Sequence, residues 1–168
     1  MTAPTLTTAR LTLRGPQDDD APALAAFYQS PRSRFNNGPL PAEQALNDLR
    51  LGRGDWALRG YGLWTITQTE TGQAIGRAGL IVHKDWHEPE LAWLLFDGYE
   101  GQGYAFEAVL AARNHSHGVL GLGPLFSFIH PRNHRSRALA IRLGATLEND
   151  TTLHGETVHI FRHPGGTA

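Results

Sequence analysis

The chain has 168 residues and a mass of 18.4 kDa, a length typical of one domain. An apolar fraction of 40% and a charged fraction of 18% argue against a disordered chain. The absence of cysteine excludes disulfides, a thiolate nucleophile and cysteine-ligated metal centres. A net charge of −1 disfavours a strongly basic nucleic-acid binder, and no apolar run reaches the roughly 18 residues needed to cross a bilayer. We therefore expect a cytoplasmic protein whose partners include neither nucleic acid nor a membrane.

The hydrophobic pattern predicts alternating strands and helices. Period-two alternation at residues 9–14 predicts a strand, the acidic residues at 18–20 start a helix to about Tyr28, and Pro41 starts a second helix to about Leu51 or a little beyond. The later predicted elements are strands at 61–67, 73–82 and 90–96, a helix at 104–118, a strand at 125–129, a helix at 133–143 and strands at 145–147 and 156–161. This order predicts one mixed α/β domain over residues 1–168.

The segment from Leu91 to Ala108 carries the most chemical information. A very apolar strand runs into a glycine-rich turn, which opens an alanine-rich helix. The first N–H groups of a helix lack intrahelical partners and carry partial positive charge, so this turn is a candidate cradle for a pyrophosphate. An ordinary tight strand–helix turn explains the same glycines equally well. The lysine and hydroxyl residue of a P-loop are missing, and Phe106 stands where a dinucleotide fingerprint needs a third glycine.

Three ordered motifs resemble one protein family. The run Tyr99-Glu100-Gly101-Gln102-Gly103-Tyr104-Ala105-Phe106-Glu107-Ala108 resembles the acetyl-CoA-binding motif of the GNAT N-acetyltransferases, in the branch of ribosomal-protein N-terminal and spermidine acetyltransferases. Residues 6–14 are similar to the opening strand of that branch. Asn133-His134-Arg135-Ser136, followed by Leu143-Gly144-Ala145, resembles its N-x-x-S…L-G-F segment. The resemblance covers about residues 6–162.

The resemblance implies a GNAT fold and direct acetyl transfer from acetyl-CoA, as co-substrate, to a primary amine. The fold would be a mixed, mostly antiparallel sheet of about seven strands, flanked by about four helices and splayed between the fourth and fifth strands. A small-molecule amine or a peptide N-terminus would be the acceptor, and a homodimer is compatible with the family. The implied cofactor-binding residues are Leu94, Leu95 and Phe96, through free strand N–H groups, with Gly101, Gln102, Gly103, Tyr104, Ala105, Phe106 and Asn133.

The resemblance also suggests catalytic residues. A mostly protonated amine must lose a proton before it attacks, and Glu90, at the start of the fourth strand, is the first candidate for the base. His87 and Glu88 are alternatives from the preceding loop, and a solvated strand-end carboxylate is the plain structural interpretation of Glu90. Ser136 is the candidate for assisting the leaving thiolate, because Ala140 stands where many family members carry a tyrosine acid. Asn133 serves equally well as a helix N-cap.

Several alternatives stay open on the sequence alone. Glu100 stands where the family often has Gln or Arg, which places a carboxylate beside the expected pyrophosphate. Together with Ala140, this residue leaves room for a non-catalytic acyl-CoA sensor or scaffold of the same fold. A Rossmann-type dehydrogenase would require a parallel sheet. Nine histidines raise the question of a metal, but their spacing offers no clear third ligand, so no metal site is predicted.

Overall fold

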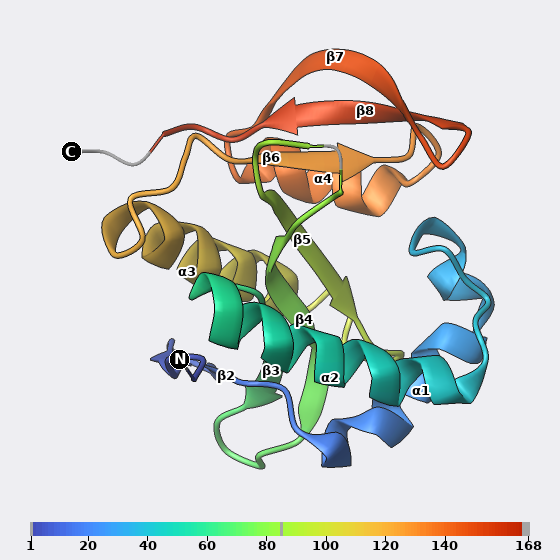
Figure 1. Ribbon diagram of the computed structural model, residues 1–168, viewed down its shortest axis with the longest axis vertical. Helices are drawn as coiled ribbons and strands as arrows, with labels where there is room; N and C mark the ends of the chain where they lie inside the picture. The colour runs from blue at the N-terminus through green and yellow to red at the C-terminus, as the bar shows by residue number, and fades with distance from the viewer. Residues whose placement is uncertain (1, 85, 166–168) are drawn as a thin grey trace.

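The computed structural model describes residues 2–84 and 86–165 of the chain (Figure 1). Four α-helices and two short 3-10 helices, η1 and η2, connect the strands of one sheet within these residues. The strands are β1 (Leu6–Thr7), β2 (Leu11–Arg14), β3 (Leu63–Gln68), β4 (Ala74–Ile81), β5 (Glu90–Leu95), β6 (Phe126–Ile129), β7 (Thr146–Leu153) and β8 (Glu156–Arg162). The helices are η1 (Asp18–Asp20), α1 (Ala21–Gln29), η2 (Pro31–Phe35), α2 (Ala42–Arg59), α3 (Tyr104–Gly118) and α4 (His134–Arg142).

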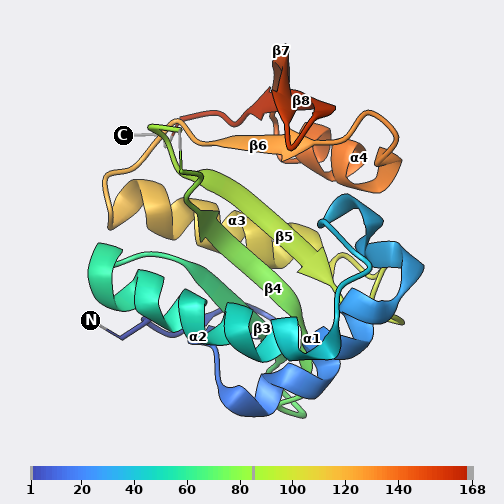
Figure 2. The ribbon, with the colours of Figure 1, turned by 45° about the vertical axis from the view of Figure 1, so that its right-hand side comes forward.

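The sheet splits in its middle. Its strand order is β1-β2-β3-β4-β5-β6-β8-β7, and neighbours are antiparallel except for β5 and β6. These two parallel strands pair in register at Glu90 and Phe126 and then diverge (Figure 2). The predicted mixed, splayed sheet is confirmed, and the predicted fourth and fifth strands correspond to β5 and β6.

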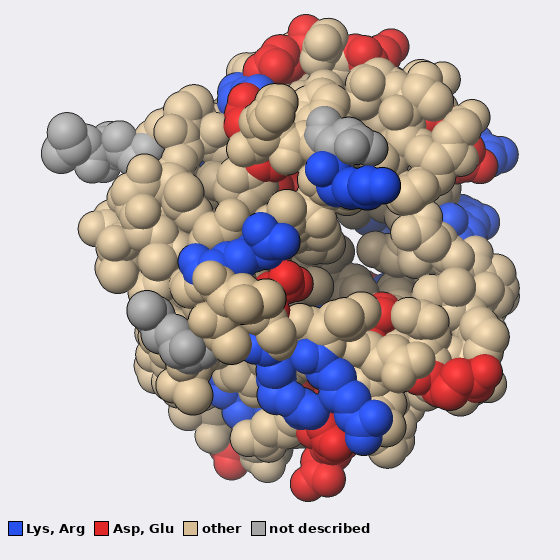
Figure 3. All heavy atoms as spheres, in the orientation of Figure 1, with Lys and Arg blue, Asp and Glu red and all other residues tan. Residues whose placement is uncertain are grey.

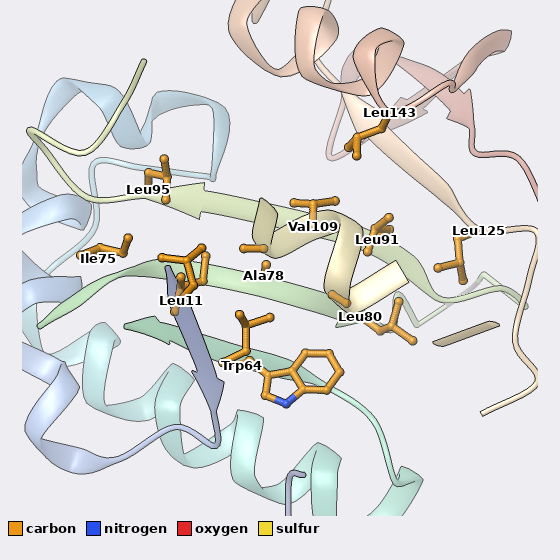
Figure 4. Close-up of a cluster of buried hydrophobic side chains, with 14 of the residues drawn as sticks. Leu11, Trp64, Ile75, Ala78, Leu80, Leu91, Leu95, Val109, Leu125 and Leu143 are labelled. Carbon is orange, nitrogen blue, oxygen red and sulfur yellow. The ribbon is translucent and has the colours of Figure 1, made fainter. Parts of the chain in front are cut away.

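Helices cover both faces of the sheet. Helices α1 and α2 lie on one face and α3 lies on the other (Figures 1 and 2). Side chains alternate along each strand, so Arg77 of β4 faces α2, close to Gly52, while its neighbour Ala78 joins the core cluster that includes Val109 of α3. Figure 4 shows this cluster, in which β3, β4, β5 and α3 contribute buried side chains. The packed core fixes the position of β5 and of the α3 N-terminus.

The predicted second helix and the predicted strand at 145–147 are longer in the structure, which also has one additional strand. The second helix extends beyond residue 51 to Arg59, because Trp56 anchors its last turns in the core and Gly60, at φ 76°, ends it in the left-handed conformation. The predicted strand at 145–147 is the start of the much longer β7. Most of β7 is exposed, so the alternation that marks a half-buried strand is missing there. The added β1 makes the sheet eight-stranded.

Candidate active site

The glycine-rich turn leads directly into α3. Gly101 and Gly103 have φ angles of 75° and 82°, a left-handed region that favours glycine. Gly103 is also the N-cap of α3 and has no side chain to cap the helix. The main-chain N–H groups of the first turn, from Tyr104 to Phe106, therefore retain the partial positive charge of a helix N-terminus. This local geometry suits a bound pyrophosphate.

The Glu100 carboxylate is held by neighbouring cations. Its Oε1 lies 2.7 Å from Arg32 Nη2 and 3.4 Å from Arg135 Nη1, and its Oε2 accepts from the main-chain N–H of Gly98 at 2.9 Å. Arg32 comes from η2 and Arg135 comes from α4, so three segments of the chain meet at this side chain. Arg32 also pairs with Asp97 at 2.5 Å, so the two arginines together offset the negative charges of Glu100 and Asp97 beside the turn.

A cavity of about 450 Å³ opens at the splay between β5 and β6. Figure 3 shows a hollow on the molecular surface between the η2 region and the β6–β8 region. Glu90, at the start of β5, and Asn133 and Ser136, at the start of α4, all line this one cavity. Other lining residues come from η2 and the segment after it, from the segments that follow β4 and β6, and from the β7–β8 turn with the first residue of β8: Arg34, Phe35, Asn36, His83, His130, His154 and Glu156.

The chain matches the family model described as an acetyltransferase (GNAT) domain over residues 10–146. An acetyltransferase from Agrobacterium tumefaciens is 36% identical, with a TM-score of 0.88, and the match covers 98% of this chain and 96% of that chain. This chain belongs to the GNAT acetyltransferase family. It is an enzyme that transfers an acetyl group from acetyl-CoA to a primary amine.

Two more distant structures share the fold of this acetyltransferase. Ribosomal-protein-S5-alanine acetyltransferase from Vibrio fischeri is 16% identical, with a TM-score of 0.72, and the match covers 94% of each chain. RimL, a ribosomal L7/L12 α-N-protein acetyltransferase in complex with coenzyme A, is 17% identical, with a TM-score of 0.78, and the match covers 94% of this chain and 96% of that chain. The non-catalytic alternative gains no support from these comparisons.

Glu90 of the acetyltransferase is buried, with 7% of its surface exposed. Its Oε1 accepts from the main-chain N–H of Phe128 at 3.0 Å, and its Oε2 lies 2.5 Å from His83 Nε2. The interpretation of Glu90 as a solvated strand-end carboxylate is therefore wrong. Neither of the two alternative bases lines this cavity: His87 is exposed, and the Glu88 carboxylate accepts from Arg162.

Asn133 and Ser136 occupy the first turn of α4. Asn133 Oδ1 accepts from the main-chain N–H of Ser136 at 3.2 Å, so Asn133 is the N-cap and lines the cavity at the same time. Ala140 is fully buried against Ile129 and Phe161. The position where many family members carry a tyrosine is thus a core position in this acetyltransferase.

The N–H groups of β5 that are free for a ligand differ from those predicted from the sequence. The N–H of Phe96 donates to the carbonyl of Ile75 at 2.9 Å, so it is not free for a ligand. Alternate N–H groups of an antiparallel strand point to the same neighbour, so the N–H of Leu94, in register with Arg77, also points toward β4. The N–H groups of Trp93 and Leu95 point the other way, toward the split. Of the three predicted residues only Leu95 has this orientation, and Trp93 was missed.

A second cavity, of about 540 Å³, lies along α3 beside the glycine-rich turn. It shares Gln102, Gly103 and Phe106 with the turn, and Arg10 and Arg142 also line it. The Arg142 guanidinium lies 4.2 Å from the centre of the Phe106 ring. An aromatic ring and two cations therefore adjoin the turn, and one of the cations, Arg10, pairs at 2.8 Å with Glu107, which lines the same cavity.

His163 lies behind the wall of the first cavity and is 1% exposed. Its Nε2 contacts Ser127 Oγ at 2.9 Å, and Ser127 Oγ is 2.5 Å from the carbonyl oxygen of Leu91. Because the single hydroxyl proton is donated to that carbonyl, His163 Nε2 must donate to the hydroxyl oxygen. Desolvation, with positive charge from Arg113, His117 and Arg162, lowers the pKa of His163 to about 4. His163 is therefore a neutral, structural histidine.

Residues 2–84 and 86–165, which the structure describes, contain neither a metal-binding cluster nor a membrane-spanning helix. They contain no cluster of three or more His, Asp or Glu side chains that could hold a metal ion. Within the same residues, no helix combines the length and the apolar character needed to cross a membrane.

Proposed function

We propose that this acetyltransferase acetylates the α-amine of a peptide or protein, and that the acceptor enters the cavity between η2 and the β7–β8 turn. The observation that carries the proposal is the meeting of Glu90, Asn133 and Ser136 in one cavity at the split of the sheet. Two structures of the same fold have ribosomal proteins in their names as substrates, which favours a peptide amine over a polyamine. Glu90 and Glu156 line the cavity and would attract a cationic ammonium group.

Acetyl-CoA would run from the second cavity across the turn to the split. Its pyrophosphate would accept from the N–H groups of residues 101–106, and its adenosine 3′-phosphate would meet the cations of the second cavity, Arg10 and Arg142. Its pantetheine amides would pair with the β5 N–H groups that point toward the split, those of Trp93 and Leu95. The acetyl group would then reach the cavity that holds Glu90 and Ser136.

Within the site, Glu90 would take part in removing the proton from the acceptor amine. Ser136, in the first turn of α4, would donate a hydrogen bond to the leaving thiolate or hold a water there. Asn133 would orient the pantetheine arm while it caps the helix. The chain has no cysteine, so the acetyl group passes directly to the amine without a cysteine acyl-enzyme.

The test uses the purified full chain, acetyl-CoA and a short peptide with a free N-terminal serine. The same peptide with an acetylated N-terminus is the control, and spermidine is the competing acceptor. Thiol release and mass spectrometry should show one acetyl group added to the free peptide only. Faster acetylation of spermidine than of the peptide would refute the peptide proposal. Failure of acetyl-CoA to bind in calorimetry would refute the cofactor path.

A further inference from the structure

His83 and Glu90 form a largely buried pair at the start of β5. Both side chains line the first cavity, and 21% of the His83 side chain is exposed against 10% for Glu90. Both Glu90 oxygens are already engaged, one by the Phe128 N–H and one by His83 Nε2. The Phe128 ring packs against the His83 ring at 5.2 Å and 71°, which limits the tilt of the imidazole. His83 is therefore the member of the pair that is more exposed toward the cavity.

The contact with Glu90 selects one tautomer of His83. An ionised carboxylate can only accept hydrogen bonds, so His83 Nε2 must carry the proton that lies between the two side chains. In the neutral ring the lone pair is then on Nδ1. A carboxylate that holds one nitrogen of a histidine fixes its tautomer and stabilises the imidazolium that forms when the other nitrogen accepts a proton.

We propose that His83 is the catalytic base of this acetyltransferase and that Glu90 is its positioning residue. This inference rests on the proposed function, because it requires the acceptor amine to enter the cavity that His83 lines. An imidazole is also a better-matched base near neutral pH than a carboxylate. The other charged or titratable side chains lining the cavity are Arg34, His130, His154 and Glu156.

The acceptor ammonium loses two protons in the course of the reaction. The acceptor ammonium gives one proton to His83 Nδ1, and the imidazolium is stabilised by the Glu90 carboxylate. The amine lone pair forms the C–N bond to the thioester carbonyl, and the C–S bond breaks as the tetrahedral intermediate collapses. The second amine proton goes to the departing thiolate, which leaves as free CoA. His83 then returns its proton to water.

A histidine base and a carboxylate base lead to different expectations for the activity of His83 and Glu90 variants. His83→Gln keeps an N–H donor for Glu90 but removes the group that accepts the proton. We expect this change to lower kcat/KM about 10²–10⁴-fold near neutral pH, with unchanged acetyl-CoA affinity and with a smaller loss at high pH, where the free amine is more abundant. The double variant His83→Gln/Glu90→Gln should be no slower than His83→Gln, because residues that act as a unit are not additive. His87→Gln, an exposed histidine in the adjacent loop, is the matched control and should keep full activity.

The measurement combines thiol release from acetyl-CoA and the serine peptide across pH with ¹⁵N NMR of the His83 ring. The proton on Nε2 should be visible in the wild type, and Glu90→Gln should move it toward Nδ1. An unchanged pH–rate profile in His83→Gln, combined with loss of the acidic limb in Glu90→Gln, would show that Glu90 is the base and overturn the proposal. A wild-type His83 ring with its proton on Nδ1 would overturn the proposal for His83, even if the enzyme turns over no acceptor. Absence of turnover together with a proton on Nε2 would count against the peptide proposal alone.

Discussion

Replacing His163 with Phe should make the stability of this acetyltransferase much less sensitive to mildly acidic pH. The folded protein binds a proton at His163 only near pH 4, whereas an unfolded chain binds one near the ordinary value of 6.5. The unfolded state therefore holds more protons between these values, and folding stability falls as the pH drops. The contribution of the neutral ring is fully present above about pH 6.5 and is lost progressively toward pH 4.

The size of this effect follows from the two pKa values. The difference between 6.5 and about 4 amounts to roughly 3 kcal/mol once both states are protonated. Between pH 7 and pH 5 the same linkage removes about 2 kcal/mol from the wild type. His163→Phe has no titrating ring and loses the bond to Ser127, which costs about 1 kcal/mol at every pH. The stability gap between the two proteins should therefore close, and then reverse, on acidification.

Urea unfolding, followed by circular dichroism at several pH values, measures both proteins directly. The matched control is His134→Gln, since His134 is exposed at the start of α4 and its removal should leave the pH dependence intact. Parallel stability curves for wild type and His163→Phe between pH 7 and pH 5 would refute the reasoning, because they would mean that the buried ring is protonated at no extra cost.

Three further predictions concern the site and its support. Gly103→Val should weaken acetyl-CoA binding at least tenfold in calorimetry, because a branched residue is strained at φ 82° and would crowd the turn; unchanged affinity in the folded variant would place the pyrophosphate elsewhere. Ser136→Ala should lower turnover about 10–150-fold, the value of one hydrogen bond to a charged group, with acetyl-CoA affinity retained, and full activity would make Ser136 a mere helix residue. Asp20→Asn should cost roughly 3 kcal/mol in urea unfolding, because buried Asp20 pairs with Arg14 at 2.6 Å and accepts from Thr65 at 2.7 Å; a loss below 0.5 kcal/mol, typical of a neutral surface change, would argue against this pair.

The sequence was sufficient where the signal is local. A glycine turn before an alanine-rich helix and a capping residue before α4 are encoded within a few neighbouring positions, and the structure has both. Only the first residues of β7 were predicted, because most of its side chains face solvent and main-chain pairing with β8 holds the strand in place. The end of α2 depends on Trp56 reaching the core, which is a tertiary contact that no local pattern reports.

His83 could have been found by carrying the strand prediction one step further. Residues 73–82 and 90–96 were both predicted as strands, and an antiparallel pair puts Glu90 opposite Ile81. His83 follows Ile81 by one period of strand alternation, so it shares the face of Glu90. The direction of the Phe96 N–H also required the pairing partner of β5, since hydrophobicity alone does not distinguish the two edges of a strand.

Ala140 links the core to the chemistry of the leaving group. Its side chain is fully buried with Ile129, Ala145 and Phe161, so the volume that a tyrosine would need is already filled by the core. A proton donor at this position would have to displace packed side chains, which typically costs 1–3 kcal/mol or more. The first turn of α4 is exposed to the cavity instead, and it combines the Ser136 hydroxyl with helix N–H groups that favour negative charge. We therefore expect the first turn of α4 to stabilise the thiolate, one turn before the position where a tyrosine would stand.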